Sequence, residues 1–221
     1  MEEKARSGTL LKQKIYQYLK DEICSGSYKS GQQVHEQELA NRFKSSRSPV
    51  REALKQLVSD GLLEEYPNRG VFVRTYSPKD MQDIFDLREL LENYAIRHVG
   101  TISPVNIRQL NDLLTSLNRF HEADDLEHYI EEDAILHHKI VSMCKNDLII
   151  DTYNRISNMT QQFRTYSLKS RQRFDDSVEE HTRLIRSLLD GNTEDAAATN
   201  KKHLSLARDA IIRYLKSSET Q

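Results

Sequence analysis

Residues 46–73 read SRSPVREALKQLVSDGLLEEYPNRGVFV, and this stretch decides the fold of the first third of the chain. Leu54 and Leu57 belong to an apolar stripe at helical spacing. The stripe follows two serines that can each cap a helix and a proline, Pro49, that a first helical turn tolerates. Gly61 ends the pattern, because glycine readily adopts the left-handed conformation that stops a helix. Two runs of strand-forming residues around PNRG then predict a β-hairpin.

Two further helices are expected upstream of this stretch. Apolar residues from Leu11 to Ile23 recur at helical spacing until a turn at Gly26, and Glu36 begins a shorter helix that ends near Phe43. The order is then helix, helix, tight turn, helix and hairpin. This order is typical of a winged helix-turn-helix, in which the third helix enters the DNA major groove with its N-terminal end leading.

The residues at that leading end suit DNA. Arg47 and Arg51 lie one helical turn apart with Ser48 between them, and Arg69 lies at the hairpin tip. Arginine can pair with two acceptors of guanine, while serine hydroxyls and free backbone N–H groups at a helix start suit phosphates. From spacing alone, the alternative that these arginines are merely solvated carries equal weight.

The segment VHEQELANRF (residues 34–43), taken with residues 46–73, resembles the winged helix of GntR-family bacterial regulators. The resemblance implies that the two arginines of the third helix and Ser48 contact DNA, and that Gly70 lets the wing approach the minor groove. The chain departs from the family pattern at Lys44, where the family favours glycine. This departure puts the geometry of the turn in question, but not the fold.

Composition indicates a mostly helical, soluble protein. Charged residues make up 30% of the 221 residues, and there are only seven glycines and four prolines. The net charge of −2 is uneven, because residues 1–76 hold 13 basic and 10 acidic side chains. Cys24 and Cys144 are isolated, so we expect reduced thiols. The start of the chain has no apolar signal region and no apolar run approaches a membrane span, so we expect a cytoplasmic protein.

The rest of the chain predicts an all-α second domain. Ser77 can cap a helix whose first residue is Pro78. Apolar periodicity then predicts an antiparallel bundle of six helices. The expected helices span residues of about 78–99, 104–121, 124–144, 147–170, 177–190 and 193–216. The predicted domains are therefore a winged helix-turn-helix at residues 1–76 and an α-helical metal-binding, effector-binding and dimerisation domain at residues 77–221.

Four residues able to bind a metal fall on the inward stripes of these helices. Asp133 and His137 are four residues apart and share one helix face, while His181 and His203 lie on the apolar stripes of two later helices. A buried polar group without a partner costs roughly 1–3 kcal/mol, so four that converge suggest a shared ligand. Three imidazoles and one carboxylate suit Zn²⁺, Ni²⁺, Mn²⁺ or Co²⁺ and leave coordination positions open. The alternative is that each histidine forms its own hydrogen bond in the core, and the pattern weighs the two equally.

The segments EEDAILHHKIV (residues 131–141) and EEHTRLIRSLLDGN (residues 179–192) are similar to the ligand-binding FCD domain of the FadR subfamily of GntR regulators. The number of helices resembles the VanR-like branch of that subfamily. In those domains an aspartate, a histidine four residues later and two further histidines bind a divalent metal. The resemblance thus implies the same role for Asp133, His137, His181 and His203.

Three residues are candidates for contact with an effector. Arg88 lies on the inward stripe of its helix and can meet the carboxylate of an acid, although a salt bridge with Glu92 explains it equally well. Tyr153 and Thr160 face the same interior from the fourth predicted helix. We therefore expect a homodimeric transcription factor that binds a pseudopalindromic operator and responds to a small carboxylate at the metal.

Two alternatives stay open at this point. In the first, the metal ion itself is the signal. In the second, the protein is a metal-dependent hydrolase with a DNA-binding head, because an open metal site can activate water. Glu131 and Glu132 could act as the base, but both should turn away from the metal-bearing face of their helix.

Overall fold

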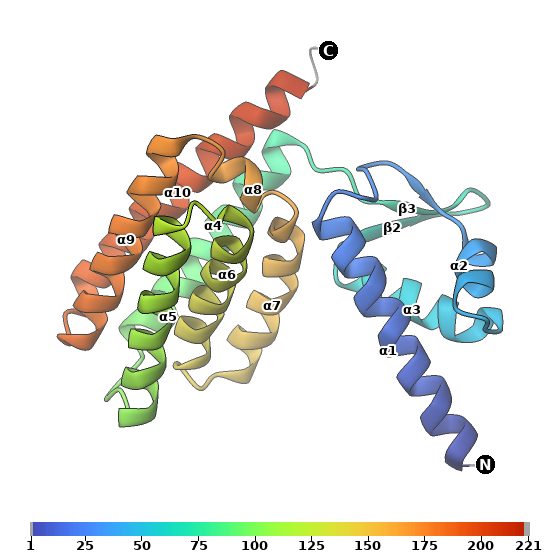
Figure 1. Ribbon diagram of the computed structural model, residues 1–221, viewed down its shortest axis with the longest axis horizontal. Coiled ribbons are helices and arrows are strands. Elements are labelled where there is room, and N and C mark those ends of the chain that lie inside the picture. The colour runs from blue at the N-terminus through green and yellow to red at the C-terminus, as the bar shows by residue number, and fades with distance from the viewer. Residues whose placement is uncertain (1, 219–221) are drawn as a thin grey trace. The chain divides into compact units, whose positions relative to one another are not determined.

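The computed structural model describes the backbone of residues 2–218 and the side chains of residues 9–217 (Figure 1). The chain divides into two compact units, Met1–Thr75 and Tyr76–Gln221. No helix in the described part of the chain is both long and apolar enough to cross a bilayer. The predominantly α-helical class predicted from the sequence is confirmed.

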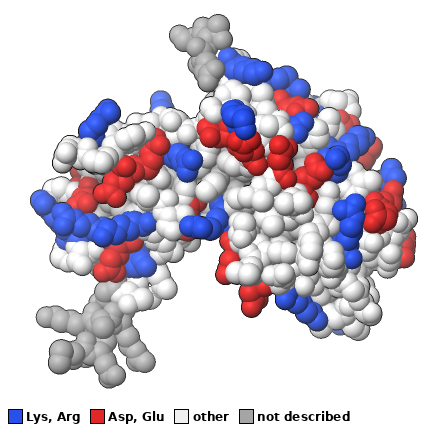
Figure 2. Space-filling view, turned by 180° about the vertical axis from the view of Figure 1, so that it is seen from behind, with Lys and Arg blue, Asp and Glu red and all other residues white. Residues whose placement is uncertain are grey.

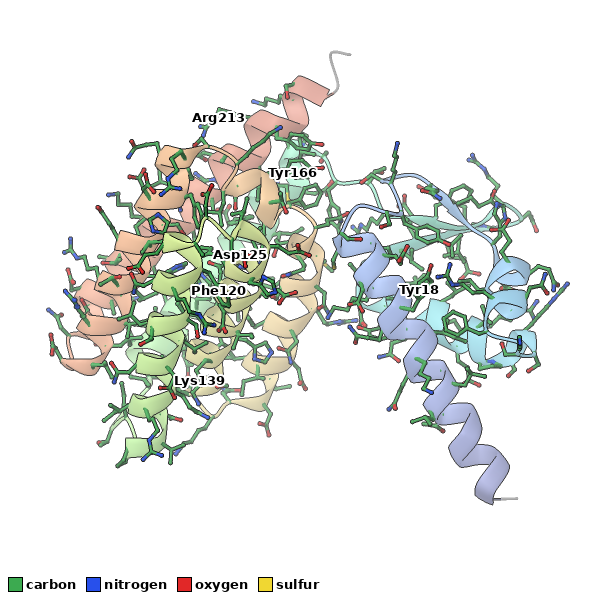
Figure 3. The ribbon with its side chains drawn as sticks, in the orientation of Figure 1. Tyr18, Phe120, Asp125, Lys139, Tyr166 and Arg213 are labelled. Atoms are coloured by element: carbon green, nitrogen blue, oxygen red, sulfur yellow. The ribbon has the colours of Figure 1, made fainter. Side chains whose placement is uncertain are left out.

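The first unit has three helices and a three-stranded antiparallel sheet in the order β1-β3-β2. The helices pack over the sheet through one apolar core, and Tyr18, labelled in Figure 3, contributes to it from α1 by an edge-on contact with Phe43. This arrangement confirms the winged helix-turn-helix. Its elements are α1 (Glu2–Cys24), β1 (Gln33–Val34), α2 (Glu36–Arg42), α3 (Arg47–Ser59), β2 (Leu63–Tyr66) and β3 (Gly70–Val73).

Strand β1 was not predicted from the sequence. It has only two residues, Gln33 and Val34, which pair with Phe72 and Val71 of β3. A two-residue strand carries no alternation that a sequence pattern could reveal. Its pairing places Gln33 beside the wing, which bears on the DNA-contacting surface described below.

The turn between α2 and α3 forms without the glycine that the family favours. Lys44 itself adopts the left-handed conformation, with φ of +47°. A single non-glycine residue in that conformation costs roughly 1–2 kcal/mol, which the packed unit tolerates. Of the two candidate caps for α3, the structure selects Ser46, although its side chain makes no capping hydrogen bond.

The second unit is a helical bundle. The expected cap at its start is present, since Ser77 and Asp80 form a reciprocal capping box with Pro78 in the first turn. Helix α4 packs against α6, α7 and α10, and α5 packs against α6 and α9. The helices are α4 (Pro78–Arg97), α5 (Pro104–Glu122), α6 (Leu126–Ser142), α7 (Asp147–Gln161), α8 (Arg164–Ser167), α9 (Arg171–Leu189) and α10 (Thr193–Ser218).

The six predicted helices are all present, but two have different bounds. The helix expected over residues 147–170 is divided into α7 and the four-residue α8, with Gln162 and Phe163 between them. Helix α9 begins at Arg171 rather than residue 177, because Ser170 caps it by accepting a hydrogen bond from the backbone of Arg173. Both differences bring new side chains into the bundle interior.

Candidate metal centre and DNA-contacting surface

The four predicted ligand residues meet inside the second unit. Asp133 and His137 project from α6, His181 from α9 and His203 from α10, and all four side chains are buried. One ligand atom from each lies within 4.8 Å of the others. Helix periodicity explains the arrangement, because each residue continues the apolar stripe that packs its helix into the bundle.

One nitrogen of His137 is already engaged away from this cluster. Its Nδ1 lies 2.8 Å from Oε2 of Glu92 on α4, and both side chains are fully buried. The other oxygen of Glu92 accepts hydrogen bonds from Nε and Nη2 of Arg88, at 3.1 and 3.0 Å. Burial raises the pKa of Glu92, but His137 and Arg88 outweigh it and hold the pKa of this carboxyl well below its ordinary value. Glu92 is thus an ionised acceptor that orients the imidazole.

The other two histidines are oriented in the same way. Nδ1 of His181 lies 3.0 Å from the hydroxyl of Tyr129, which in turn donates to Oγ of Ser177 at 3.0 Å. Because the hydroxyl proton is used on Ser177, its oxygen accepts from His181. Nδ1 of His203 lies 2.9 Å from Oε2 of Glu180. Every imidazole therefore has a partner for Nδ1 outside the cluster, and Nη2 of Arg173 also lies 3.3 Å from Nδ1 of His203.

The Nε2 atoms of His137 and His181 lie close to each other and to one oxygen of Asp133. Nε2 of His181 lies 3.4 Å from Nε2 of His137 and 3.1 Å from Oδ1 of Asp133. Nε2 of His137 lies 3.6 Å from the same oxygen. Protonation would relieve the repulsion, but burial lowers the pKa of both His181 and His203 well below the ordinary value, and the neighbouring imidazoles add to the effect. The centre therefore brings three imidazole nitrogens and a carboxylate oxygen close enough to share one cation.

The donor set fits a divalent transition metal. Ligand bonds of about 2.1 Å place two opposite donors about 4.2 Å apart, so the widest separation of 4.8 Å needs only a small movement of the side chains. Carboxylate and imidazole donors that each have an outer hydrogen-bond partner are typical of metal sites. The buried cluster could hold a metal, and Asp133, His137, His181 and His203 are the residues that would bind it.

Two buried arginines next to the cluster were missed by the sequence analysis. Arg164 of α8 forms an ion pair with Oδ2 of Asp133, the oxygen that points away from the imidazoles. Arg173 of α9 donates to Oε2 of Glu180 at 2.9 Å. The sequence did indicate that Arg164 faces inward, because it lies four residues after Thr160 on the same predicted helix. It could not indicate this for Arg173, because Arg173 precedes residue 177, where its helix was predicted to begin.

The predicted effector residues lie at different places. Arg88 and Thr160 line a small cavity of about 20 Å³ that also includes Asp133, Arg164 and His203. Arg88 forms the salt bridge with Glu92 that was the alternative explanation for it. Tyr153 does not line this cavity but is buried in an apolar core of the unit, where its side chain interacts with Arg88.

The predicted DNA contacts of α3 lie on the surface of the first unit. Arg47 and Arg51 are exposed in the first turns of α3, and Ser48 is exposed between them. Helix α2 holds both guanidinium groups: Nε of Arg47 donates to Oε1 of Gln37 at 3.0 Å, and Nε of Arg51 donates to Oε2 of Glu36 at 2.8 Å. The two arginines are thus presented together at one end of the helix.

The wing presents a third arginine. Arg69 lies in the turn between β2 and β3, with its guanidinium carbon 5.6 Å from the ring centre of Tyr66. Nε2 of Gln33 donates to the backbone oxygen of Arg69 at 3.0 Å, so β1 braces the turn. Gly70 has φ of +100°, and a Cβ there would lie 3.0 Å from Nε2 of Gln33. Glycine is needed at this position for its backbone conformation, and an added Cβ would also require the exposed Gln33 side chain to move.

Charge alone does not single out this surface. Figure 2 shows basic and acidic side chains interspersed on the visible face. The small positive surplus of residues 1–76 agrees with this mixture. The position of the three arginines, at a helix start and at a wing, carries the argument for DNA contact instead.

Comparisons with known proteins match both units. The family model for bacterial regulatory proteins of the gntR family matches residues 11–73, and the FCD domain model matches residues 83–206. The fold and these matches define a DNA-binding transcriptional regulator. The chain belongs to the GntR family and carries an FCD domain, consistent with the FadR-like subfamily.

Individual relatives agree with this assignment. The Nta operon transcriptional regulator of Aminobacter aminovorans is 28% identical over 195 residues, which cover 88% of this chain and 91% of that protein. The structure of McbR/YncC from E. coli has a TM-score of 0.80 at 20% identity and covers 92% of this chain and 98% of its own. A structure described as a metal-free FCD domain has a TM-score of 0.55 at 20% identity, covering 65% of this chain and 99% of its own.

The gntR family model and the Nta operon relative describe transcriptional regulators rather than enzymes, and this chain is likewise a transcriptional regulator. The hydrolase alternative is therefore set aside. Its two candidate bases agree with this conclusion, because Glu131 is exposed and Glu132 lies outside the ligand cluster.

Proposed function

We propose that the chain is a metal-containing, homodimeric regulator whose affinity for a pseudopalindromic operator is set by a small carboxylate effector. The observation that carries this proposal is the buried group of acceptor atoms from Asp133, His137, His181 and His203, beside a cavity lined by Arg88 and Arg164. A divalent ion at the four residues would supply open coordination positions to an oxygen ligand. The two guanidiniums would attract the negative charge of that ligand.

The path from this site to the DNA-binding unit runs along α4. Glu92 on α4 orients His137, and Arg88 one turn earlier lines the cavity. The same helix begins at Pro78, and only residues 74–77 separate it from the end of β3 in the wing. A ligand that changes the contacts of Arg88 or Glu92 therefore acts on the helix that leads directly into the winged unit. Coupling of about 1–3 kcal/mol between two such sites is typical.

On the DNA side, we propose that Arg47, Arg51 and Ser48 contact the major groove and that Arg69 and Gly70 approach the minor groove. Their support is the exposed start of α3 and the braced wing. A regulator that meets its operator in this way acts in the cytoplasm, where the bacterial DNA lies.

The proposed dimer has a candidate surface on α4. Leu87, Leu90 and Tyr94 form an exposed apolar stripe, with Leu90 67% exposed. Asp83 and Arg97, both exposed, lie seven residues to either side of Leu90, which is about 10 Å along a helix. Within one chain, Asp83 pairs with Lys79 and Arg97 pairs with Glu194. If two copies of α4 pack antiparallel about Leu90, these pairs are exchanged, and Asp83 of each copy meets Arg97 of the other. Such self-complementarity is what a two-fold interface requires.

The dimer can be tested by sedimentation of matched variants. Leu90→Glu places a charge in the centre of the stripe and is expected to yield monomers. Leu148→Glu changes an equally apolar residue on α7 that is 80% exposed, and should leave the dimer intact. A dimer that survives Leu90→Glu but dissociates with Leu148→Glu would place the interface elsewhere.

DNA recognition and effector response can be tested on an operator selected from random DNA. Arg51→Ala should remove specific binding while leaving the circular dichroism spectrum unchanged, because each well-paired arginine contributes roughly 1–3 kcal/mol of discrimination. Operator titrations with metal alone and with metal plus carboxylic acids then separate the two kinds of signal. If an acid changes the operator affinity of the metal-saturated protein, the proposal of a carboxylate effector is supported. If only the ion changes the operator affinity, the protein is a metal sensor.

A further inference from the structure

The two arginines at the start of α3 are held by different kinds of acceptor on α2. Arg51 donates to a carboxylate oxygen of Glu36, and this ion pair offsets its charge. Arg47 donates to the amide oxygen of Gln37, which is neutral, so Arg47 keeps its full positive charge. A guanidinium that keeps its charge attracts the acceptors of DNA more strongly than one that is already paired. Of the two, Arg47 is therefore the arginine that is oriented without being neutralised.

The contact with Gln37 occupies one edge of the Arg47 guanidinium. Oε1 of Gln37 accepts hydrogen bonds from Nε at 3.0 Å and from Nη2 at 2.5 Å, and these two nitrogens form the side edge of the planar group. The end edge, formed by Nη1 and the second N–H of Nη2, points away from Gln37. That edge presents two parallel donors, which can pair with O6 and N7 of guanine. Gln37 thus fixes the plane of the guanidinium and leaves an edge for a base.

A second hydrogen bond fixes Gln37 itself. Its Nε2 donates to Oδ1 of Asn41, four residues further along α2, at 2.9 Å. The amide of Gln37 cannot turn over without losing this bond and placing its NH2 group against the guanidinium. Helix α2 packs against α3 (Figure 1), so Asn41, Gln37 and Arg47 form a relay of hydrogen bonds from one helix to the leading end of the other.

The relay acts on binding rather than on folding. All three side chains are exposed, and hydrogen bonds between exposed side chains add little to the stability of a fold. A long side chain, however, loses rotamer freedom when it docks on a base, and a side chain that is already held loses less. The relay therefore favours the one orientation of Arg47 in which its end edge is presented.

We propose that Gln37 is a positioning residue that sets the preference of Arg47 for guanine, and that Asn41 supports it. This inference rests on the proposed function, because it takes Arg47 to contact a base in the major groove. It adds to that function a role in specificity for two uncharged residues of α2.

The test measures base preference at each position of an operator selected from random DNA. The operator is altered one base pair at a time, and each sequence is titrated with the full-length protein by fluorescence anisotropy. The position that Arg47 reads is the one at which Arg47→Ala loses the preference for guanine. At that position, Gln37→Leu should reduce the preference about two- to tenfold, because Arg47 must then be ordered when it binds. Asn41→Ala should reduce it by less, since Gln37 still contacts Arg47.

Two further measurements distinguish positioning from a structural role. Gln37→Leu changes no charge, so its affinity for random DNA and the salt dependence of that affinity should equal those of the unmodified protein. The melting temperature should be unchanged as well. Gln56→Leu is the matched control, because it makes the same substitution at an exposed position of α3, nine residues after Arg47, and it should keep the full preference.

A double-mutant cycle shows whether Gln37 acts through Arg47. In the Arg47→Ala background, Gln37→Leu should have no further effect on base preference. A further loss in that background, or a changed preference at another base pair, would mean that Gln37 reads DNA itself and would overturn the inference. A loss of affinity that is equal for every operator and for random DNA would overturn it as well.

The outcomes also separate this inference from the function on which it rests. If Gln37→Leu keeps the full preference for guanine, the positioning role is wrong and Arg47 remains the reader of that base. If Arg47→Ala keeps the preference at every position, Arg47 reads no base, and both the inference and that part of the proposed function fall.

Discussion

His181 and His137 turn their Nε2 atoms toward each other at 3.4 Å, although the Nδ1 atom of each is already hydrogen-bonded to another side chain. Without a proton on either Nε2, the two imidazoles oppose lone pair to lone pair. A carboxylate oxygen of Asp133 at 3.1 Å from His181 adds a third acceptor to the same point. The bundle has therefore placed its acceptors where a cation would stabilise them, and the following predictions depend on that arrangement.

Removal of the metal should destabilise the protein. An ion that binds only the folded state adds roughly 2.7 kcal/mol when its free concentration is a hundred times Kd. We expect the melting temperature to fall on treatment with EDTA and to recover when Zn²⁺, Ni²⁺ or Mn²⁺ is added in excess. His181→Gln should melt at the same temperature with and without EDTA. A response to EDTA that is equal in both proteins would place the ion elsewhere.

Tyr129→Phe should weaken metal binding without altering the ligands. The substitution removes the oxygen that accepts from Nδ1 of His181 but keeps the aromatic ring that packs on Phe174. Loss of such an outer partner typically lowers metal affinity about 10–100-fold. Competition with a fluorescent chelator measures this change. Tyr166→Phe on α8 is the matched control and should keep the affinity of the unmodified protein.

The metal-free protein should lose stability as pH falls below about 6.5. Burial lowers the pKa of His181 and His203 in the folded state, whereas in the unfolded chain both histidines take up protons near pH 6.5. The unfolded state then binds more protons, so the free energy of unfolding falls by about 1.4 kcal/mol per pH unit for each imidazole. Urea titrations between pH 7.5 and 5.5 measure this slope.

Two variants identify the source of the slope. His203→Gln should make it shallower. His128→Gln should not, because the hydrogen bond from His128 to Asp125 raises the pKa of this exposed histidine. The contribution of His128 is present below its unfolded pKa and is lost as pH rises, which is the opposite sign. An unchanged slope in His203→Gln would contradict the assignment.

Gly70→Ala should destabilise the winged unit and distort the wing. The backbone at Gly70 has φ of +100°, and the added Cβ would lie 3.0 Å from Nε2 of Gln33. We expect a loss of about 1 kcal/mol or more in the free energy of unfolding, together with weaker operator binding. Arg69→Ala changes the neighbouring surface residue and should weaken DNA binding while leaving stability within about 0.5 kcal/mol. Equal stability of both variants would mean that the wing tolerates the added Cβ.

The sequence was sufficient for the parts of the fold that depend on local signals. Ser77 and Pro78 marked the start of α4 because capping and proline preference act within one helical turn. The break between α7 and α8 had no such mark, since Gln162 and Phe163 are ordinary helix residues and only their tertiary surroundings end the helix there. Strand β1 likewise exists only because β3 pairs with it.

The candidate site shows the same division. Asp133 and His137 could be placed on one inward face from their spacing of four residues, and the stripes of α9 and α10 placed His181 and His203. The partners that orient them could not be predicted, because Glu92 and His137 lie 45 residues apart and meet only through the packing of α4 on α6. Helical periodicity predicts which way a residue faces, but not which residue it meets.

The most direct test of the metal centre is an anomalous difference map from crystals grown with a stoichiometric divalent transition metal. We predict one peak per chain in the second unit, about 2.1 Å from Asp133 and from Nε2 of His137, His181 and His203. A map with no peak there, with each imidazole hydrogen-bonded only to its own neighbours, would contradict it.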